Sequence, residues 1–327
     1  MGPMKLYFDV RDIFRAPRLA LSGKKIWVML QANIVGYAIY WVFTYLSLAV
    51  TGASLGDTWA RYGLYPCLVG NGGNWIAYVI WIIGLLAWLV ALVLGSTAVA
   101  RITYKQLKGD EFYSASDSWQ FVKKHWHAPV FTHVSIAIIA LFFVVMAVIF
   151  ALVGKIPYLG ELFFGIPYLI WFFGSVFVVY TAIVLAVSVF FTHAIVGTLE
   201  EDTMGSVFQN YSITWSQPWR VVAYLSVLGV LIYAGVMVFG WFMTVGYGLI
   251  NVVFGHHWLM GSTLANMVGW ASNLVLGEFS PVGWFLGYYS GPSWYFEVPP
   301  AAASLEPLEY VGGLFVAVSL FLIVGTV

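Results

Sequence analysis

The stretch Val130–Val153 reads VFTHVSIAIIALFFVVMAVIFALV and contains no Asp, Glu, Lys or Arg. A membrane-spanning helix needs about 20 predominantly apolar residues, because lipid offers no hydrogen-bond partner to an exposed backbone group. This stretch meets both the length and the polarity requirement. It therefore predicts a transmembrane helix.

Five further stretches have the same character, with no charged residue in their interior. Together with the first they give six expected spans: Ile26–Ala49, Ile76–Ala100, Val130–Val153, Ile166–Ala194, Val221–Ile250 and Leu308–Val327. We therefore expect an all-α, polytopic membrane protein with six transmembrane helices and the lipid bilayer as its main partner.

The composition agrees with this class and excludes several others. Of the 327 residues 61% are apolar and only 9% are charged, whereas a soluble domain carries about 25% charged residues. A cytosolic enzyme or a disordered chain is therefore excluded. The 14 basic and 14 acidic residues cancel, which excludes a nucleic-acid partner. The single cysteine, Cys67, excludes an internal disulfide framework and a Cys-rich metal centre.

Basic residues set the expected orientation. Twelve of the 14 Lys and Arg residues fall before the first span or in the connections on the same side as the N-terminus. Since cytoplasmic connections are enriched in Lys and Arg, we expect both termini inside. The membrane that we expect is a bacterial cytoplasmic (inner) membrane. The connection 251–307 then lies outside.

Each inner connection carries an amphipathic pattern ahead of the next span, with apolar residues at i, i+4, i+7 and i+11. We expect Ser114 or Ser116 to cap the second of these helices and Asp202 or Thr203 to cap the third, while Pro17 kinks or breaks the first. The apolar positions are Val10, Phe14, Pro17 and Leu21; Ala115, Trp119, Val122 and Trp126; and Met204, Phe208, Tyr211 and Trp215.

These patterns predict three units, 1–100, 101–196 and 197–327, each an amphipathic helix followed by a two-helix hairpin. The alternative is that Trp residues and amphipathic segments mark membrane interfaces in any helical membrane protein.

The stretch Leu199–Tyr224 reads LEEDTMGSVFQNYSITWSQPWRVVAY, and Leu107–Val130 is a weaker echo of it. This layout resembles the membrane-anchor domain of bacterial glycerophosphodiester phosphodiesterases and of related uncharacterised bacterial membrane families. The soluble catalytic domain of those phosphodiesterases, with its acidic metal ligands, has no counterpart in this sequence. The resemblance therefore implies a membrane scaffold and supplies no catalytic residue.

The outer connections differ in length. Val50–Trp75 and Gly154–Gly165 are short, whereas 251–307 is long and aromatic, with a short helix expected over Ser262–Leu276. Such a loop either caps the chain's own helices or docks a partner, with a ligand-binding lid as a third reading. The residues expected to dock a partner are Trp258, Trp270, Trp284, Tyr288, Tyr289, Trp294, Tyr295 and Phe296.

Two groups of histidines are the candidates for cofactor chemistry. His133 and His193 lie near the same end of neighbouring spans and form a candidate haem or metal pair. His256 and His257, with Glu278, form a candidate metal site. Interfacial histidines more often bond to backbone, and no HExxH spacing is present, so no cofactor is predicted.

We expect a non-enzymatic scaffold or accessory subunit of a larger membrane complex, which docks other subunits or lipids through its interfacial helices and outer loop. The alternatives are a small permease or lipid-handling transporter, and an electron-transfer subunit with haem or metal. Glycines at 229 and 240, and at 235 and 246, form two small-residue grooves on the fifth span. A permease cavity would be lined by polar span residues: Asn33, Tyr40, Thr44, Ser135, Ser175, Tyr180, Thr181, Ser188 and Tyr224.

Overall fold

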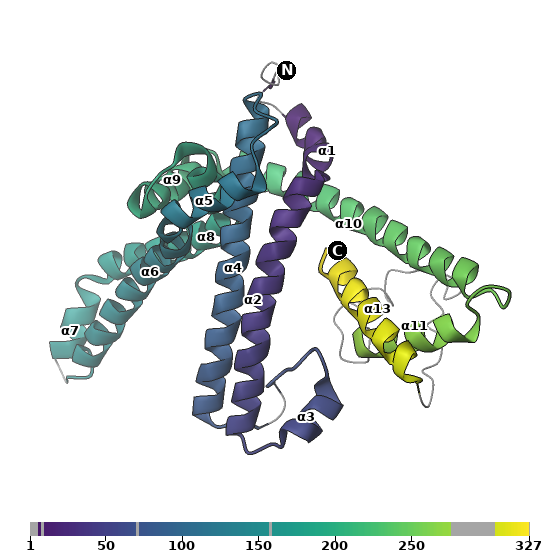
Figure 1. Ribbon diagram of the computed structural model, residues 1–327. Coiled ribbons are helices and arrows are strands. Elements are labelled where there is room, and N and C mark those ends of the chain that lie inside the picture. The colour runs from purple at the N-terminus through teal and green to yellow at the C-terminus, as the bar shows by residue number, and fades with distance from the viewer. Residues whose placement is uncertain (1–5, 8–9, 70–71, 157–158, 276–304, 327) are drawn as a thin grey trace. The chain divides into compact units, whose positions relative to one another are not determined.

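The computed structural model describes residues 6–7, 10–69, 72–156, 159–275 and 305–326. Within these ranges the regular structure is helical and no strand occurs. Five helices are long and apolar enough to cross a membrane. They are α2 (Gly23–Val50), α4 (Trp75–Leu107), α6 (His127–Val153), α8 (Tyr168–Leu199) and α10 (Pro218–Phe254) (Figure 1).

The sixth apolar stretch forms a shorter helix, α13 (Pro307–Thr326). Shorter helices join the long ones: the 3₁₀ helix Val10–Arg15, α1 (Ala16–Ala20), α3 (Leu55–Tyr62), α5 (Ala115–His125), α7 (Leu159–Gly165), α9 (Thr203–Ser216) and α11 (Ser262–Val275). The expected helices at 115, 203 and 262 are confirmed. Helices α3 and α7 were not predicted, because each lies inside a connection that reads only as a short loop.

The chain divides into two compact units. One, the α6–α8 unit, comprises Met1–Ile13 and Val93–Val227; the other, the α2–α13 unit, comprises Phe14–Leu92 and Leu228–Val327. Helices α4 and α10 each contribute residues to both units.

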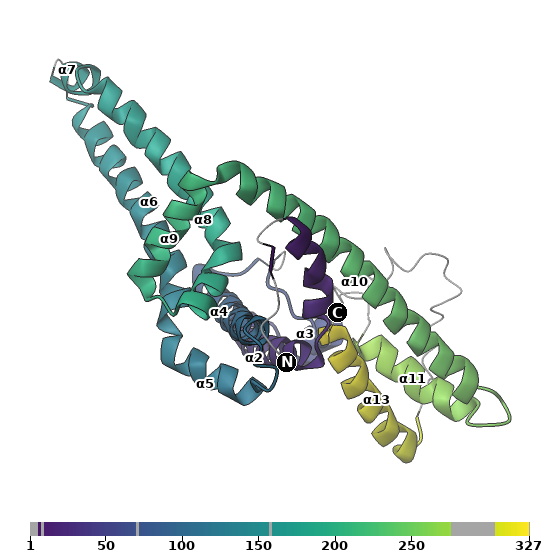
Figure 2. The same cartoon turned by 90° about the horizontal axis from the view of Figure 1, so that it is seen from above.

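In the α6–α8 unit, α6 and α8 lie side by side and run antiparallel (Figures 1 and 2). Phe150 contacts Trp171 near one end of the pair, with ring centroids 4.5 Å apart, and Ile136 packs with Val184 nearer the other end. Val207 of α9 completes this buried cluster. The pair is therefore closed on one side by α9.

Helix α9 packs through its small and polar residues. Ser206, Asn210 and Thr214 are buried, and the Asn210 amide donates to Thr192 Oγ1 at 3.0 Å. Three of the four expected apolar positions face away from the unit: Met204, Phe208 and Trp215 are 58%, 69% and 78% exposed. The fourth, Tyr211, packs against the buried cluster and donates to Thr181 Oγ1 at 3.1 Å. In a membrane an apolar outer face and hydrogen-bonded polar contacts between helices are the stable arrangement.

In the α2–α13 unit, α2 and α4 approach closely at glycines. A Cβ on Gly36 would lie 2.6 Å from the Trp88 ring, and one on Gly84 would lie 2.6 Å from Phe43. Trp88 Nε1 also donates to Asn33 Oδ1 at 3.0 Å. Glycine is needed at both positions because any larger residue would separate the helices.

Helix α13 packs against α2 and α11. Tyr37 contacts Phe321 with ring centroids 5.9 Å apart, and Gly325 lies beside Leu30, so α13 runs antiparallel to α2. Gly312 and Gly313 lie beside Met267 and Trp270 of α11. The last apolar helix thus contacts the first, and the expected grouping into three hairpin units stays a prediction.

The N-terminal segment is broken at its proline, as expected. The 3₁₀ helix ends at Arg15 and Pro17 lies in the first turn of α1, where its missing N–H costs nothing. Lys25 is buried, and its ammonium donates to the Leu19 carbonyl at 2.8 Å. This contact ties the C-terminal end of α1 to the start of α2.

Candidate functional sites: an arginine junction and a tyrosine cluster

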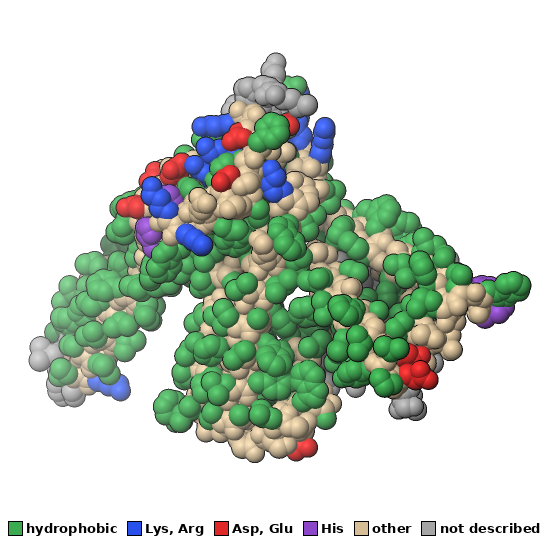
Figure 3. All heavy atoms as spheres, in the orientation of Figure 1, with side chains coloured by type: hydrophobic (Ala, Val, Ile, Leu, Met, Phe, Trp, Pro, Cys, Tyr) green, Lys and Arg blue, Asp and Glu red, His purple; other side chains and the backbone are tan. Residues whose placement is uncertain are grey.

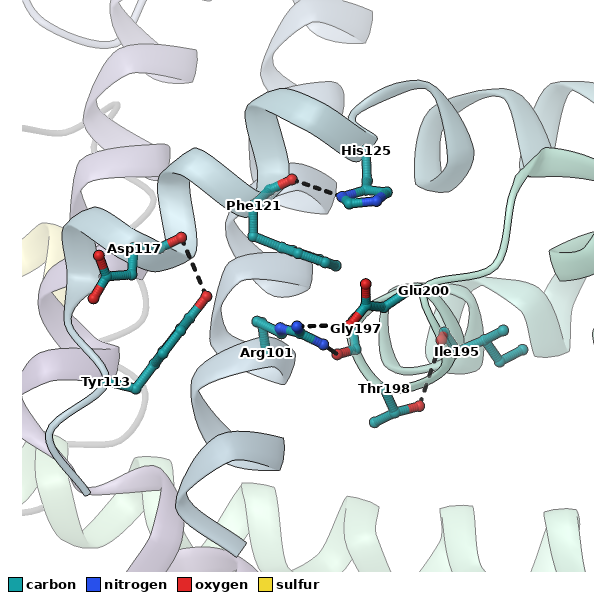
Figure 4. Close-up of polar contacts among 9 residues, drawn as sticks. All are labelled: Arg101, Tyr113, Asp117, Phe121, His125, Ile195, Gly197, Thr198 and Glu200. Atoms are coloured by element: carbon teal, nitrogen blue, oxygen red, sulfur yellow. Dashed lines mark hydrogen bonds and ion pairs between the residues drawn. The ribbon is translucent and has the colours of Figure 1, made fainter. Parts of the chain in front are cut away.

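Charged side chains of the α6–α8 unit gather around α5 and the adjoining end of α4, whereas apolar side chains cover the α6–α8 pair (Figure 3). Arg101 of α4 is the buried member of the charged group, with a relative exposure of 7%. Its Nη2 pairs with Glu200 Oε1 at 2.7 Å, and its Nη1 donates to the Gly197 carbonyl at 3.3 Å (Figure 4). Arg101 therefore joins α4 to the C-terminal end of α8.

The flat face of the same guanidinium lies on α5. Arg101 Cζ is 4.3 Å from the centroid of the Phe121 ring, a distance typical of a cation–π contact. His125 extends the stack, with its ring centroid 4.4 Å from that of Phe121 and its Nδ1 3.0 Å from the Phe121 carbonyl. Three helices thus meet at one arginine.

Local sequence positions α5 for this contact. Ser114 accepts from the Asp117 N–H at 3.1 Å, and Asp117 accepts from the Ser114 N–H at 3.1 Å, which is a capping box. Hydrogen bonds from Ser114 also hold the pKa of Asp117 below its usual value, which favours the ionised carboxylate of the capping box. Ser114, rather than Ser116, is therefore the cap.

The end of α8 is fixed by backbone conformation as well as by charge. Glu200 has φ +59°, the left-handed conformation usual at a helix C-terminus but costly for a residue with a Cβ. The hydrogen bond from Arg101 lowers the pKa of Glu200, and the charges of Arg101, His125 and Lys105 act in the same direction. At Gly197, a Cβ would lie 2.9 Å from the Ala100 Cβ.

The chemistry available at this junction is binding and positioning. Arg101 is a permanent cation, and two of its nitrogens are engaged by Glu200 and Gly197. Sequence reasoning missed the junction because it counted Arg101 only as a basic residue flanking a span. Its position could have indicated the junction, because Arg101 directly follows the apolar stretch that ends at Ala100.

The α2–α13 unit contains a second polar cluster, centred on Tyr37. Its ring lies 5.4 Å from Trp88, 5.9 Å from Tyr40 and Phe321, and 6.2 Å from Tyr65, measured between centroids. Helices α2, α4 and α13 and the segment after α3 all contribute a ring to this cluster. Such packed rings contribute more than their buried area alone.

Three phenols of α2 donate to the backbone of the segment after α3. Tyr37 Oη donates to the Leu64 carbonyl at 2.6 Å, Tyr40 Oη to Pro66 at 3.0 Å and Tyr45 Oη to Gly63 at 2.6 Å. This pairing could not be predicted, because a phenol–carbonyl bond between residues 18 to 27 positions apart leaves no periodic pattern in the sequence.

The predicted haem or metal pair lies on neighbouring helices, as expected. His133 Nδ1 is 2.8 Å from the Pro129 carbonyl, and His193 is bonded to the Val189 backbone and close enough to His133 to interact electrostatically. In the described ranges no group of three or more His, Cys, Asp or Glu residues is arranged to hold a metal ion. A Soret band in the purified protein is the measurement that would assign haem to the pair.

The second predicted metal site is only partly described. His256 and His257 are exposed and lie in a turn, with ring centroids 4.4 Å apart. The Trp258 N–H donates to His256 Nδ1 at 3.4 Å, a long bond. Glu278 lies outside the described residues.

The residues expected to dock a partner fall into three groups. Trp258 is 81% exposed. Trp270 packs internally, with its ring centroid 4.9 Å from Tyr310 of α13. Trp284, Tyr288, Tyr289, Trp294, Tyr295 and Phe296 lie outside the described residues. The part of the long connection formed by α11 is thus packed against the chain's own helices.

No family model, curated protein or solved structure matches this chain.

Proposed function

We propose that the chain is a non-enzymatic subunit of a larger membrane complex, and that α10 is the helix that docks a transmembrane helix of another subunit. In this proposal all six apolar helices cross a bacterial inner membrane and both termini lie inside. The observation that carries the proposal is that Gly229, Gly235, Gly240 and Gly246 of α10 are all open, whereas several glycines on the other apolar helices contact a neighbouring helix.

Several glycines on the other apolar helices are in close contact with a neighbouring helix, whereas Gly23 at the start of α2 and Gly174 on α8 are open. A Cβ added to Gly36, Gly84, Gly197 or Gly312 would lie within 3 Å of an atom of another helix. On α10, a Cβ added to Gly229, Gly235, Gly240 or Gly246 would have no described atom within 4 Å. Small residues on a membrane helix allow a second helix to approach closely, and these four positions have room for one.

The hydrogen bonds of the spans support a subunit over a permease. A permease needs polar groups that face a substrate path. Of the polar residues expected to line such a path, Asn33 bonds to Trp88, Tyr40 to the Pro66 carbonyl and Tyr180 to the Tyr211 carbonyl. Thr44, Ser175, Thr181 and Ser188 each bond to the backbone of their own helix. Bonds of this kind join or stabilise helices, which supports the subunit over the permease.

The experiment compares complexes recovered in mild detergent from the native membrane. We expect the wild-type chain to elute in an assembly larger than one copy. Replacing Gly235 and Gly246 together by Leu, or Gly229 and Gly240 together, should release partners, because Leu fills the groove. Gly174→Leu on α8 is the matched control, since Gly174 is equally open but belongs to no expected groove.

Two results contradict the proposal. One is a wild-type chain that elutes as a single copy under every mild condition. The other is loss of partners from Gly174→Leu to the same extent as from the α10 variants. The thermal midpoint of each purified variant, measured by loss of the monodisperse peak, separates lost docking from lost folding.

A further inference from the structure

We infer that residues 63–68 form a re-entrant segment, which turns back into the membrane after α3 and is held there by Tyr37, Tyr40 and Tyr45. The sequence places these residues in a short loop outside the membrane. The inference does not depend on a docked partner and so stands apart from the proposed function.

The positions of the three tyrosines carry the first step. They lie 13, 10 and 5 residues before Val50, the last residue of α2, which is roughly 20, 15 and 8 Å along the helix axis at about 1.5 Å per residue. Tyr37 is near the midpoint of α2 (Gly23–Val50). Even allowing for the length of the phenol side chain, the Leu64 carbonyl lies well inside the end of this helix.

The surroundings of the segment carry the second step. Leu64 packs against Ala271 and Val275 of α11 and against Ala317 and Leu320 of α13. Pro66 and Leu68 are buried. The segment therefore lies among three helices, and both α2 and α13 are apolar over this length.

The hydrogen bonds carry the third step. Water satisfies the carbonyls of an external loop, whereas irregular backbone at membrane depth must find partners within the protein. Here the carbonyls of Gly63, Leu64 and Pro66 each accept a phenol from α2. A segment removed from water needs donors from the protein for its carbonyls, and the three phenols supply them.

Cys67 is the one cysteine of the chain and lies within the segment, so the native protein carries its own probe. The full-length protein in liposomes is treated with a membrane-impermeant maleimide, which is confined to water, and separately with a membrane-permeant, lipid-soluble maleimide. Both reagents should label Cys67 after the protein is unfolded in SDS, which shows that the thiol itself is intact. The reference is the double variant Ala60→Cys, Cys67→Ser, whose cysteine lies on the exposed surface of α3. The water-confined reagent should label Cys67 of the wild type at least tenfold more slowly than the cysteine of this variant.

The phenols are tested by Tyr37→Phe combined with Tyr40→Phe, which keeps both rings and removes two donors. We expect labelling of Cys67 by the water-confined reagent to rise towards the rate at Ala60. Tyr78→Phe on α4 is the control for loss of a phenol elsewhere, and monodisperse elution shows that each variant is folded.

Rapid labelling of wild-type Cys67 by the water-confined reagent would place the segment outside the membrane and overturn the inference. Labelling of folded Cys67 by neither reagent would agree with the inference, because a thiol removed from water does not form the reactive thiolate. An unchanged rate in the folded double variant would show that the phenols do not hold the segment. The wild-type measurement decides the location even if the double variant fails to fold.

Discussion

Glu200 is the residue whose protonation we expect to weaken the α6–α8 unit. The hydrogen bond from Arg101 lowers its pKa below the ordinary value of 4.5, so the carboxylate stabilises the folded chain fully above that pH. The contribution is lost as the pH falls through the lowered pKa. We expect the thermal midpoint of the purified protein to fall on acidification below about pH 4.5.

Glu200→Gln isolates this effect, because the amide keeps the shape of the side chain and cannot ionise. The variant should melt lower than wild type at neutral pH and should lose part of the acid-dependent decrease. Glu201→Gln, one position along, is the control and should retain the wild-type pH profile. Identical profiles for wild type and Glu200→Gln would show that the Arg101 pair contributes nothing to stability.

Gly197 tests the close approach of α4 and α8. A Cβ there would lie 2.9 Å from the Ala100 Cβ and 3.1 Å from the Arg101 backbone nitrogen, and backbone cannot move aside as a flexible side chain can. Gly197→Leu should therefore cost about 1–3 kcal/mol by overpacking. Gly174→Leu, on the same helix with no described atom nearby, should be neutral or slightly stabilising. The comparison is made by thermal melting in detergent.

The sequence predicted residues whose partners are local and missed those whose partners are distant. The caps Ser114 and Asp202 bond to Asp117 and Gly205 within their own helices, so the sequence alone limited each cap to two neighbouring candidates. Arg101 is 99 positions from Glu200, and Tyr37 is 27 positions from Leu64. No periodic pattern links residues so far apart, and only the folded chain pairs them.

At the scale of helices, α5 is expected to depend on its cap. Ser114→Ala removes the side chain that accepts from Asp117 N–H and donates to Asp117 Oδ2. We expect a loss of about 1 kcal/mol and a lower thermal midpoint. Ser116→Ala is the matched control two residues away, because Ser116 is exposed and is not the cap. Equal losses from both variants would contradict the capping role.

The sequence predicts where the long helices begin and end better than it predicts which helices contact one another. The expected span 130–153 is α6, His127–Val153, and the expected span 26–49 is α2, Gly23–Val50. Apolar length decides these bounds. The contacts of α13 with α2 and α11 depend on tertiary packing at glycines such as Gly312. The sequence predicted only that the last span pairs with the fifth in a hairpin.

At the scale of the whole chain, the direction of α13 makes the proposed topology testable. Because α13 runs antiparallel to α2, a membrane-crossing α13 returns the C-terminus to the side of the N-terminus. The test uses reporters fused after Lys108, Met260 and Thr326, one active only in the cytoplasm and the other only outside. In the proposed topology two, five and six crossings precede these positions.

We expect the cytoplasmic reporter to be active after Lys108 and Thr326 and the external reporter to be active after Met260. The fusion after Thr326 is decisive, because α13 is shorter than the five long helices. An active external reporter there would mean that α13 enters the membrane without crossing it, leaving five spans. The fusion after Lys108 checks orientation independently, since the basic residues Lys105 and Lys108 precede it and hold that connection inside.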